Sequence, residues 1–314
     1  MKIIRGLKNY PCLTGRSVVA IGNFDGVHLG HQALLRTISE RATQEDLSTV
    51  VIIFEPQPLE WFCPEQAPAR LTPFHEKIRI FEKWGVDYVL CLPFDRRLSA
   101  LTPQSFIETC LMRQLNTAVL FVGEDFRFGY QRQGDIHLLA TYARQGYFDC
   151  VQIPTVSVAG DKISSTLIRQ ALSRYDFEYA SQLLGRPYAI TQRVRRGDQR
   201  GRTLGFPTLN LLIKHPRLVL SGVFAVEVRL PSGASYQGVA NLGLRPTVNG
   251  TRPQLEAHLF GFNQEIYGQM VTVIMRQFIR AEQRFPNLEA LQAQIQQDVS
   301  AARQFFAHNE YAVK

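Results

Sequence analysis

Two histidines, His28 and His31, lie in a glycine-rich segment, GNFDGVHLGH, that runs from Gly22 to His31. Imidazole N–H groups can donate hydrogen bonds to phosphate oxygens, and glycines let a backbone approach a ligand closely. The segment follows the apolar run SVVAIGNF and precedes the apolar-periodic QALLRTI. Because α/β proteins bind phosphates where a strand turns into a helix N-terminus, the sequence predicts a phosphate-binding loop here.

A second polar segment, ISSTLIR, opens a predicted helix with Ser164, Ser165 and Thr166, and places Arg169 one turn later. Hydroxyl groups and free helix N–H groups can bind phosphate, and an arginine adds a positive charge. A simple helix cap would use the same hydroxyls. Taken alone, the segment therefore leaves both interpretations open.

The second half contains an arginine-rich run, RVRRGDQRGRTLGFPTLNL, from Arg193 to Leu211, with five arginines in ten residues. A nucleic-acid-binding or solvated basic surface would have this composition. The later part of the same run contains Gly201, Gly205, Thr208 and Asn210. Hydroxyl and amide oxygens are ligands that suit Mg²⁺, so these residues also predict a phosphate and magnesium site.

A carboxylate that could accept a proton lies in the short run LEAHLF, which contains Glu256. Alternation along a strand puts Glu256 and His258 on one face and Leu255, Ala257 and Leu259 on the other. A general base needs a carboxylate of this kind next to a substrate hydroxyl. An ordinary surface glutamate on a strand is the alternative.

In the first half of the chain, predicted strands alternate with predicted helices. Apolar strand-like runs begin near Ser17, Ser48, Asp87, Thr117 and Cys150, and helical spacing covers the stretches 31–44 and 73–84. Alternation of strands and helices predicts a parallel sheet, whose strands are buried on both faces. We expect an α/β domain over residues 1–184.

The pattern of apolar residues changes after the helical spacing of Phe177 to Leu184. Short β-rich runs separated by Gly, Pro, Asn and Arg predict a small antiparallel barrel, and residues 287–308 predict one closing helix. Its expected apolar stripe consists of Leu288, Leu291, Ile295, Val299, Ala302 and Phe305. We expect a second domain over residues 185–314.

The composition fits this two-domain interpretation, because a chain of 314 residues exceeds the usual domain of about 100 to 200 residues. With 45% hydrophobic and 20% charged residues, disorder and collagen-like repeats are excluded. No apolar run is long enough to suggest a signal-peptide core or a membrane span, so we expect a cytoplasmic location. The five cysteines, odd in number and widely spaced, predict free thiols. The net charge of +8 suits a nucleic-acid binder or an enzyme with phosphate ligands.

Taken together, these motifs resemble those of a known protein family. GNFDGVHLGH resembles the signature of the HxGH nucleotidyltransferases, and its fuller form resembles that of the bacterial bifunctional riboflavin kinase/FMN adenylyltransferases. FEPQP, VGEDFRFG and ISSTLIR match further segments of that family, as do GFPTLN, GVANLGLRPTV, LEAHLF and MRQFIRAEQRF in the second half. The motifs occur in the family's order over nearly the whole chain.

The resemblance implies a Rossmann-like HxGH domain with a parallel sheet, and a riboflavin kinase barrel closed by a C-terminal helix. It implies that riboflavin and ATP give FMN, and that FMN and ATP give FAD and pyrophosphate, with Mg²⁺ bridging phosphates. The partners would be ATP, riboflavin and FMN rather than nucleic acid or membrane. The implied catalytic residues are His28, His31, Glu256 and Arg169. The implied ligand contacts are Gly22, Phe24, Asp25, Gly26, Gly30, Asp125, Ser164, Ser165, Thr166, Gly201, Gly205, Thr208 and Asn210, of which Thr208 and Asn210 would bind the metal.

The sequence departs from the family pattern at Gln57, where histidine is common, and at Leu209, where alanine is usual. Glutamine can donate a hydrogen bond but cannot carry a proton or charge. Phe126 and Phe128 could belong to the core or stack on a flavin. Two rival functions remain: adenylylation or cytidylylation of another phosphate monoester, and nucleic-acid binding through Arg193 to Arg202.

Overall fold

The computed structural model describes residues 1–7, 12–158, 160–197, 205–213, 215–247 and 250–309. Its contacts divide the chain into two compact units. The first unit contains Met1–Pro68 and Thr72–Ser164, and the second contains Ala69–Leu71 and Ser165–Lys314. The division into domains at residue 184 stays a prediction.

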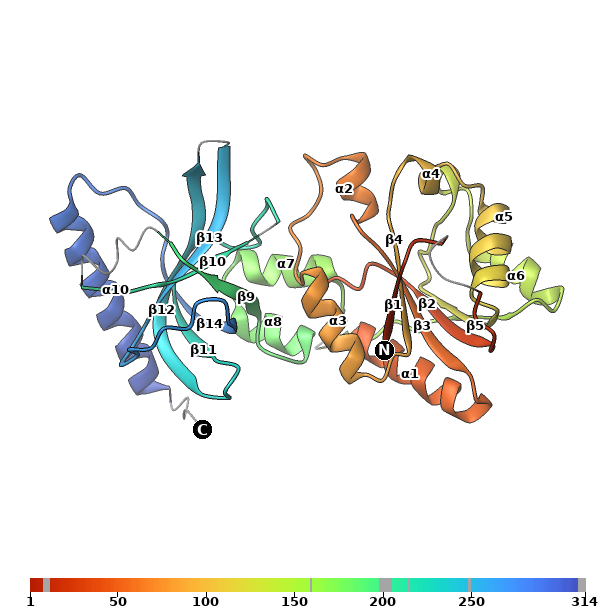
Figure 1. The fold of residues 1–314 in the computed structure, drawn as a ribbon, viewed down its shortest axis with the longest axis horizontal. Coiled ribbons are helices and arrows are strands. Elements are labelled where there is room, and N and C mark those ends of the chain that lie inside the picture. The colour runs from red at the N-terminus through yellow and green to blue at the C-terminus, as the bar shows by residue number, and fades with distance from the viewer. Residues whose placement is uncertain (8–11, 159, 198–204, 214, 248–249, 310–314) are drawn as a thin grey trace. The chain divides into compact units, whose positions relative to one another are not determined.

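The first unit is built on a parallel sheet of six strands in the order β1-β4-β3-β2-β5-β6 (Figure 1). The strands are β1 (Lys2–Arg5), β2 (Ser17–Ile21), β3 (Ser48–Phe54), β4 (Tyr88–Leu92), β5 (Thr117–Val122) and β6 (Asp149–Gln152). The chain winds outward from β2 through β3 to β4 and then returns to β5 on the other side of β2. The strand order therefore reverses between β2 and β5.

Helices and short elements connect these strands. They are α1 (Leu29–Glu45), α2 (Pro58–Phe62), α3 (Phe74–Lys83), α4 (Arg96–Ser99), α5 (Pro103–Phe106), the π-helix η1 (Ile107–Gln114), the 3₁₀ helix η2 (Tyr130–Arg132) and α6 (Ile136–Arg144), with a hairpin of β7 (Ser157–Val158) and β8 (Asp161–Lys162). The predicted helices over 31–44 and 73–84 correspond to α1 and α3. The strand of this sheet that we did not predict is β1, an edge strand of four residues. We also did not predict the short elements α2, α4, α5, η1, η2, α6, β7 and β8.

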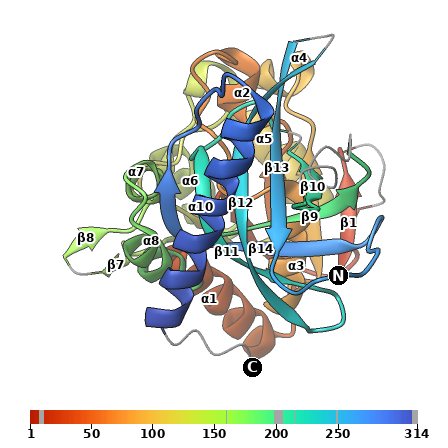
Figure 2. The same ribbon diagram turned by 90° about the vertical axis from the view of Figure 1, so that its left-hand side faces the viewer.

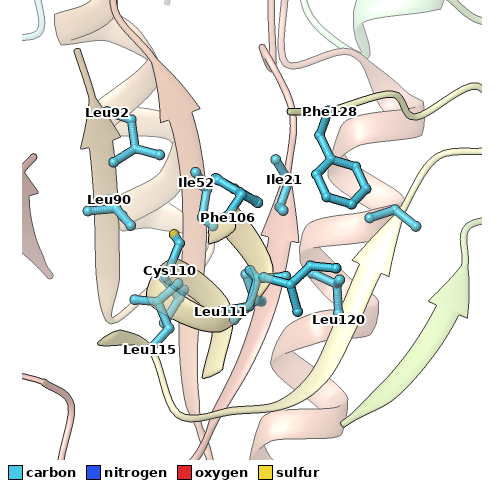
Figure 3. Close-up of a cluster of buried hydrophobic side chains, with 14 of the residues drawn as sticks. Ile21, Ile52, Leu90, Leu92, Phe106, Cys110, Leu111, Leu115, Leu120 and Phe128 are labelled. Carbon is cyan, nitrogen blue, oxygen red and sulfur yellow. The ribbon is translucent and has the colours of Figure 1, made fainter. Parts of the chain in front are cut away.

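Alternate side chains of the central strands point to opposite sides of the sheet, and helices cover both faces. On one face, Val18 and Ala20 of β2 join a core with α1 and α3. On the other, Val19 and Ile21 join a core with α5, η1 and α6. Figure 3 shows this second core, in which Phe106 and Leu111 lie against Ile21, Ile52 and Leu120. Burial on both faces makes these strands continuous apolar runs.

The second unit contains α7 (Ser165–Ser173), α8 (Phe177–Leu184) and a closed antiparallel barrel in the order β10-β13-β12-β11-β14-β9. The barrel strands are β9 (Ala189–Arg195), β10 (Leu209–Leu212), β11 (Gly222–Arg229), β12 (Ser235–Thr247), β13 (Gly250–Leu259) and β14 (Met270–Arg280). Strand β9 includes Arg193 and Arg195, at the start of the arginine-rich run.

A long helix, α10 (Leu288–His308), lies along the outside of this barrel (Figure 2). Asn287 caps it by accepting a hydrogen bond from the Ala290 N–H at 2.8 Å. Ala302 and Phe306 are buried against Val223, Ala225 and Val239 of the barrel. The predicted helix is confirmed, but its predicted stripe is wrong at one end. Leu288, in the first turn of α10, stays exposed, because periodicity predicts an apolar face but not which of its residues find a packing partner.

The predicted fold class is thus confirmed in both units: a parallel α/β sheet, then an antiparallel barrel with a C-terminal helix. All five cysteines are free thiols, as predicted. Within the described residues, no helix is both long enough and apolar enough to span a bilayer.

Candidate functional site

The glycine-rich loop lies at the reversal of strand order in the first unit. It leaves the carboxyl end of β2, and the segment 123–129 leaves the carboxyl end of the neighbouring β5. In open parallel sheets, ligands bind outside the carboxyl ends of the strands where the order reverses. The topology therefore places both predicted segments where an α/β sheet binds ligands.

The loop has a fixed and strained backbone. Phe24 and Val27 have positive φ angles of 47° and 40°, although both side chains are buried. Gly26 has a φ of 85°, which glycine adopts without a steric penalty. The buried Asp25 accepts a 3.1 Å hydrogen bond from the Thr72 N–H. Strain of this kind persists only where the surroundings fix it, and it is common at ligand sites.

The two histidines stack on each other at the start of α1. Their ring centroids are 3.7 Å apart, and the His28 Nδ1 accepts a 3.4 Å hydrogen bond from the His31 backbone N–H. A Cβ atom on Gly30 would lie 3.2 Å from this Nδ1, so glycine leaves room for the ring. Burial, and then the charges of His28 and Lys77, hold the pKa of His31 well below its usual value. A neutral imidazole keeps one N–H donor. Both rings can thus present an N–H donor at a helix N-terminus.

A cavity of about 570 Å³ lies beside this loop within the first unit. Gly22 and Asn23 line it from the first loop, and Asp125 lines it from the second. Its remaining wall is largely apolar and includes the aromatic rings of Phe54, Phe62, Phe94, Phe106, Phe126 and Phe128. Phe128 is buried in the core and its ring also lines this cavity. Phe126 stacks on Phe128, with ring centroids 5.4 Å apart. Such a wall suits a flat aromatic ligand.

The predicted helix-cap segment falls at the division between the two units. Ser164 ends the first unit, and Ser165, Thr166 and Arg169 belong to α7 in the second. The Arg169 Nε donates a 2.7 Å hydrogen bond to the Ala69 carbonyl, which belongs to the same unit. Their contact with a nucleotide stays a prediction.

Gln57 occupies the N-cap of α2 and is 6% exposed. Its backbone N–H donates to the Glu60 carboxylate at 2.8 Å. Its side-chain Nε2 is buried and has no hydrogen-bond partner among the residues that the structure describes. A buried donor of this kind is costly unless a ligand satisfies it.

The second unit has its own cavity, of about 310 Å³, between the barrel and α10. Its polar lining includes Thr208, Asn241, Glu256 and His258. Leu255, Ala257 and Leu259 are buried on the opposite face of β13, as the alternation predicted. The His258 Nδ1 donates to the Pro207 carbonyl at 2.9 Å, because a carbonyl oxygen can only accept.

Asn210 lies in β10 directly opposite Glu256 of β13. Its side-chain Nδ2 donates to the Thr208 carbonyl at 3.3 Å, and its Oδ1 accepts from Gln254 at 2.6 Å. A carbonyl-type oxygen has two lone pairs, so Oδ1 can also bind a cation. Gly205 has a φ of 83°, which favours glycine, whereas Gly201 lies outside the described residues.

These oxygen donors fit a magnesium ion that keeps most of its ligands from water and phosphates. A metal site made of protein side chains alone would need several ligating side chains close together. In the described part of the chain, no group of three or more His, Cys, Asp or Glu side chains could hold a metal. The donor set of Thr208 and Asn210 therefore fits a metal that arrives with a nucleotide.

The aromatic and basic segment at the end of the barrel divides between two places. Arg280 and Phe285 line the 310 Å³ cavity. Arg276 instead pairs with Glu227, and Phe278 stacks on Tyr175 with centroids 3.8 Å apart. The four residues therefore do not share one site.

Residues of these sites that the sequence analysis missed include Asp298 and Lys77. Asp298 of α10 is 3% exposed and forms a two-pronged ion pair with Arg280. Lys77 of α3 is 1% exposed and donates a 2.7 Å hydrogen bond to the Asn23 carbonyl in the glycine-rich loop. Both lie on otherwise apolar helix faces, which is a signal that the sequence contains.

Comparison with known proteins agrees with the division of the chain into two units. The family model for FAD synthetase matches residues 12–167, and the model for riboflavin kinase matches residues 184–306. The two sites thus define the chain as a nucleotidyltransferase-type α/β unit followed by a kinase-type barrel.

Similarity to curated relatives extends over both units. The chain is 47% identical over 307 residues to the bifunctional riboflavin kinase/FMN adenylyltransferase of Escherichia coli (strain K12), and covers 98% of each sequence. It is 44% identical over 306 residues to the protein of that name from Haemophilus influenzae, with 98% of this chain and 99% of the relative covered. The chain belongs to the bifunctional riboflavin kinase/FMN adenylyltransferase family.

A solved structure shares the whole fold. It is a crystal structure from Streptococcus pneumoniae described as a macrolide-efflux protein, and it matches with a TM-score of 0.76 at 30% identity. The match covers 96% of this chain and 98% of that one.

Proposed function

We propose that the barrel unit phosphorylates riboflavin and that the α/β unit adenylylates the resulting FMN. The chain is a riboflavin kinase and an FMN adenylyltransferase, as its family is, and ATP is the co-substrate of both reactions. The observation that best supports the assignment of sites is that each unit has its own cavity. Each cavity is lined by residues of the motifs matched in that unit.

In the adenylyl transfer, a phosphate oxygen of FMN attacks the α-phosphorus of ATP, and pyrophosphate leaves. His28 and His31 would donate hydrogen bonds to the triphosphate, where negative charge develops on the leaving group. Phe24, Asp25, Gly26 and Gly30 hold the loop in its strained form, and Gly22 lines the adjoining cavity. No protein nucleophile is needed, because positioning and charge stabilisation supply the rate.

The aromatic cavity would hold the flavin ring of FMN, with Asp125 at its edge. Gln57 would donate its buried Nε2–H to a phosphate or ribose oxygen, which satisfies the unpartnered donor. Ser164, Ser165, Thr166 and Arg169 would contact the nucleotide through the hydroxyl-rich start of α7.

In the kinase reaction, the riboflavin 5′-hydroxyl attacks the γ-phosphorus of ATP and ADP leaves. Glu256 would accept the hydroxyl proton, because it lines the cavity that would hold the flavin. Thr208 and Asn210 would bind Mg²⁺, which when present neutralises charge on the phosphates. Gly205, and Gly201 by the resemblance, would let the backbone approach the phosphates.

Incubation of the purified protein with riboflavin, ATP and Mg²⁺, followed by chromatography, tests the proposal. We expect FMN to form first and FAD to follow, and both to be lost with EDTA. Mn²⁺ and Ca²⁺ in parallel reactions identify the preferred metal. Absence of FMN would disprove the kinase assignment, and conversion of supplied FMN to any product other than FAD would disprove the adenylyl transfer.

A further inference from the structure

One side chain in the barrel contacts both of the residues proposed for the kinase reaction. The Gln254 Nε2 donates to the Asn210 Oδ1 at 2.6 Å and to the Glu256 Oε1 at 3.0 Å. A primary amide has two N–H donors. Each hydrogen of this amide therefore has one acceptor, and the two acceptors are the proposed metal ligand and the proposed base.

The strands make this arrangement possible. Gln254 and Glu256 are two residues apart on β13, so their side chains lie on the same face. Asn210 lies opposite Glu256 across the β10–β13 pairing. Gln254 is paired with Leu212 of β10 and Gly243 of β12, so its backbone is fixed from both sides.

The Asn210 amide is held in one orientation by several contacts. Its Nδ2 donates to the Thr208 carbonyl, and its Oδ1 faces Gln254. A Cβ atom at Gly197 would lie 2.5 Å from the Asn210 Cγ, so the backbone of Gly197 lies close against the amide. A flipped amide would present Nδ2 to the Gln254 donor and to the metal, and neither contact is favourable.

We propose that Gln254 is a positioning residue of the kinase site, which fixes Asn210 Oδ1 for the metal and Glu256 for the substrate hydroxyl. This inference rests on the proposed function of Asn210 and Glu256. Hydrogen-bond partners of metal ligands typically affect metal affinity or activity about 10- to 100-fold when they are removed. An isolated surface glutamine would have no such effect.

Gln254→Met tests the proposal, because methionine keeps the length of the side chain and removes both donors. Gln277→Met is the matched control, since Gln277 is an exposed glutamine of β14 whose Nε2 donates to the Phe278 carbonyl at 3.2 Å, away from Asn210 and Glu256. For each variant, we would measure kcat and the Mg²⁺ concentration that half-activates riboflavin phosphorylation. Calorimetric titration with ADP, in Mg²⁺ and in EDTA, measures how strongly the metal supports nucleotide binding without turnover.

We expect Gln254→Met to lower the kinase kcat about 10- to 100-fold and to raise the half-activating Mg²⁺ concentration. It should also reduce the ratio of ADP affinities in Mg²⁺ and EDTA, whereas Gln277→Met should match the wild type. Binding of ADP to the α/β unit is common to both variants and cancels in the comparison. Conversion of supplied FMN to FAD should be unchanged in both, which shows that the chain is folded.

Three results would overturn the inference. In the first, Gln254→Met stays within about twofold of the control. In the second, kcat falls without a change in either measure of Mg²⁺ dependence, which indicates a structural role only. In the third, both activities and the melting temperature fall together. Failure of the proposed function itself looks different, because the wild type would then form no FMN.

Discussion

The Lys77 ammonium donates a 2.7 Å hydrogen bond to the carbonyl oxygen of Asn23, and so links the buried face of α3 to the histidine loop. This contact lies one residue after Gly22, at the carboxyl end of β2. A buried ammonium that binds the backbone of a strained loop fixes the positions of the groups that the loop carries. Small displacements of such groups have large effects on rate.

Replacement of Lys77 by methionine should therefore impair the adenylyl transfer. The stem of the side chain is kept while the hydrogen bond to Asn23 is lost. We expect FAD formation from supplied FMN to fall about tenfold or more, since a misplacement of about 1 Å costs up to about 100-fold. Riboflavin phosphorylation should be unchanged. Lys83→Met, at an exposed position on the same helix, is the control, and an equal loss there would refute the role of Lys77.

The low pKa of His31 predicts how stability depends on pH. Burial and nearby positive charges keep His31 neutral in the folded chain, whereas an unfolded histidine binds a proton below about pH 6.5. The stabilisation is therefore complete above about pH 6.5 and is lost as the pH falls below it, by at most about 1.4 kcal/mol per pH unit. Urea unfolding between pH 7.5 and 5.5 should show a shallower loss in His31→Asn. The exposed His137→Asn should keep the wild-type slope, and identical slopes in all three proteins would contradict this account.

Glu256→Gln should stop the kinase while preserving the barrel. The amide retains the shape of the side chain but cannot accept the hydroxyl proton, and loss of a general base costs about 10²- to 10⁴-fold in rate. The rate of FMN formation from riboflavin and ATP checks this. Supplied FMN should still become FAD at the normal rate. Normal FMN production by the variant would exclude Glu256 as the base.

Asp298→Asn should destabilise the wall of the kinase cavity. The Arg280–Asp298 pair has N–O distances of 2.8 and 2.7 Å, and Asp298 is almost fully buried on α10. Removal of one partner leaves a poorly solvated arginine, which costs about 3 kcal/mol. We expect a lower melting temperature and a higher KM for riboflavin. Glu289→Gln, on the exposed start of α10, should cost about 1 kcal/mol or less, and equal effects would contradict a special role for Asp298.

Much of the architecture could be predicted because its strands and helices have clear periods. The continuous apolar runs of β2, β3 and β5 reflect burial on both faces, and Asn287 marked the start of α10. Strand β1 escaped prediction because only Ile4 of its four residues is buried, so it has no apolar run. Leu288 was misassigned because periodicity defines a stripe but not how far the partner surface extends.

The sequence indicated candidate site residues where a motif contains the proposed reactive group, and not where a residue supports that group after folding. Glu256 and its alternation with Leu255 follow from a local pattern. Gln254, by contrast, is significant only through Asn210, which is 44 residues away in the chain. Lys77 and Asp298 were similarly hidden, because a charged residue within an apolar stripe reveals its partner only after folding.

We propose that one chain carries out two successive reactions at two separate sites. The most direct test is the product mixture that a His28→Ala, His31→Ala variant makes from riboflavin, ATP and Mg²⁺. We expect FMN to accumulate at the wild-type rate while FAD formation falls by about 10²- to 10³-fold or more. Equal loss of FMN and FAD, or normal FAD formation, would contradict the account.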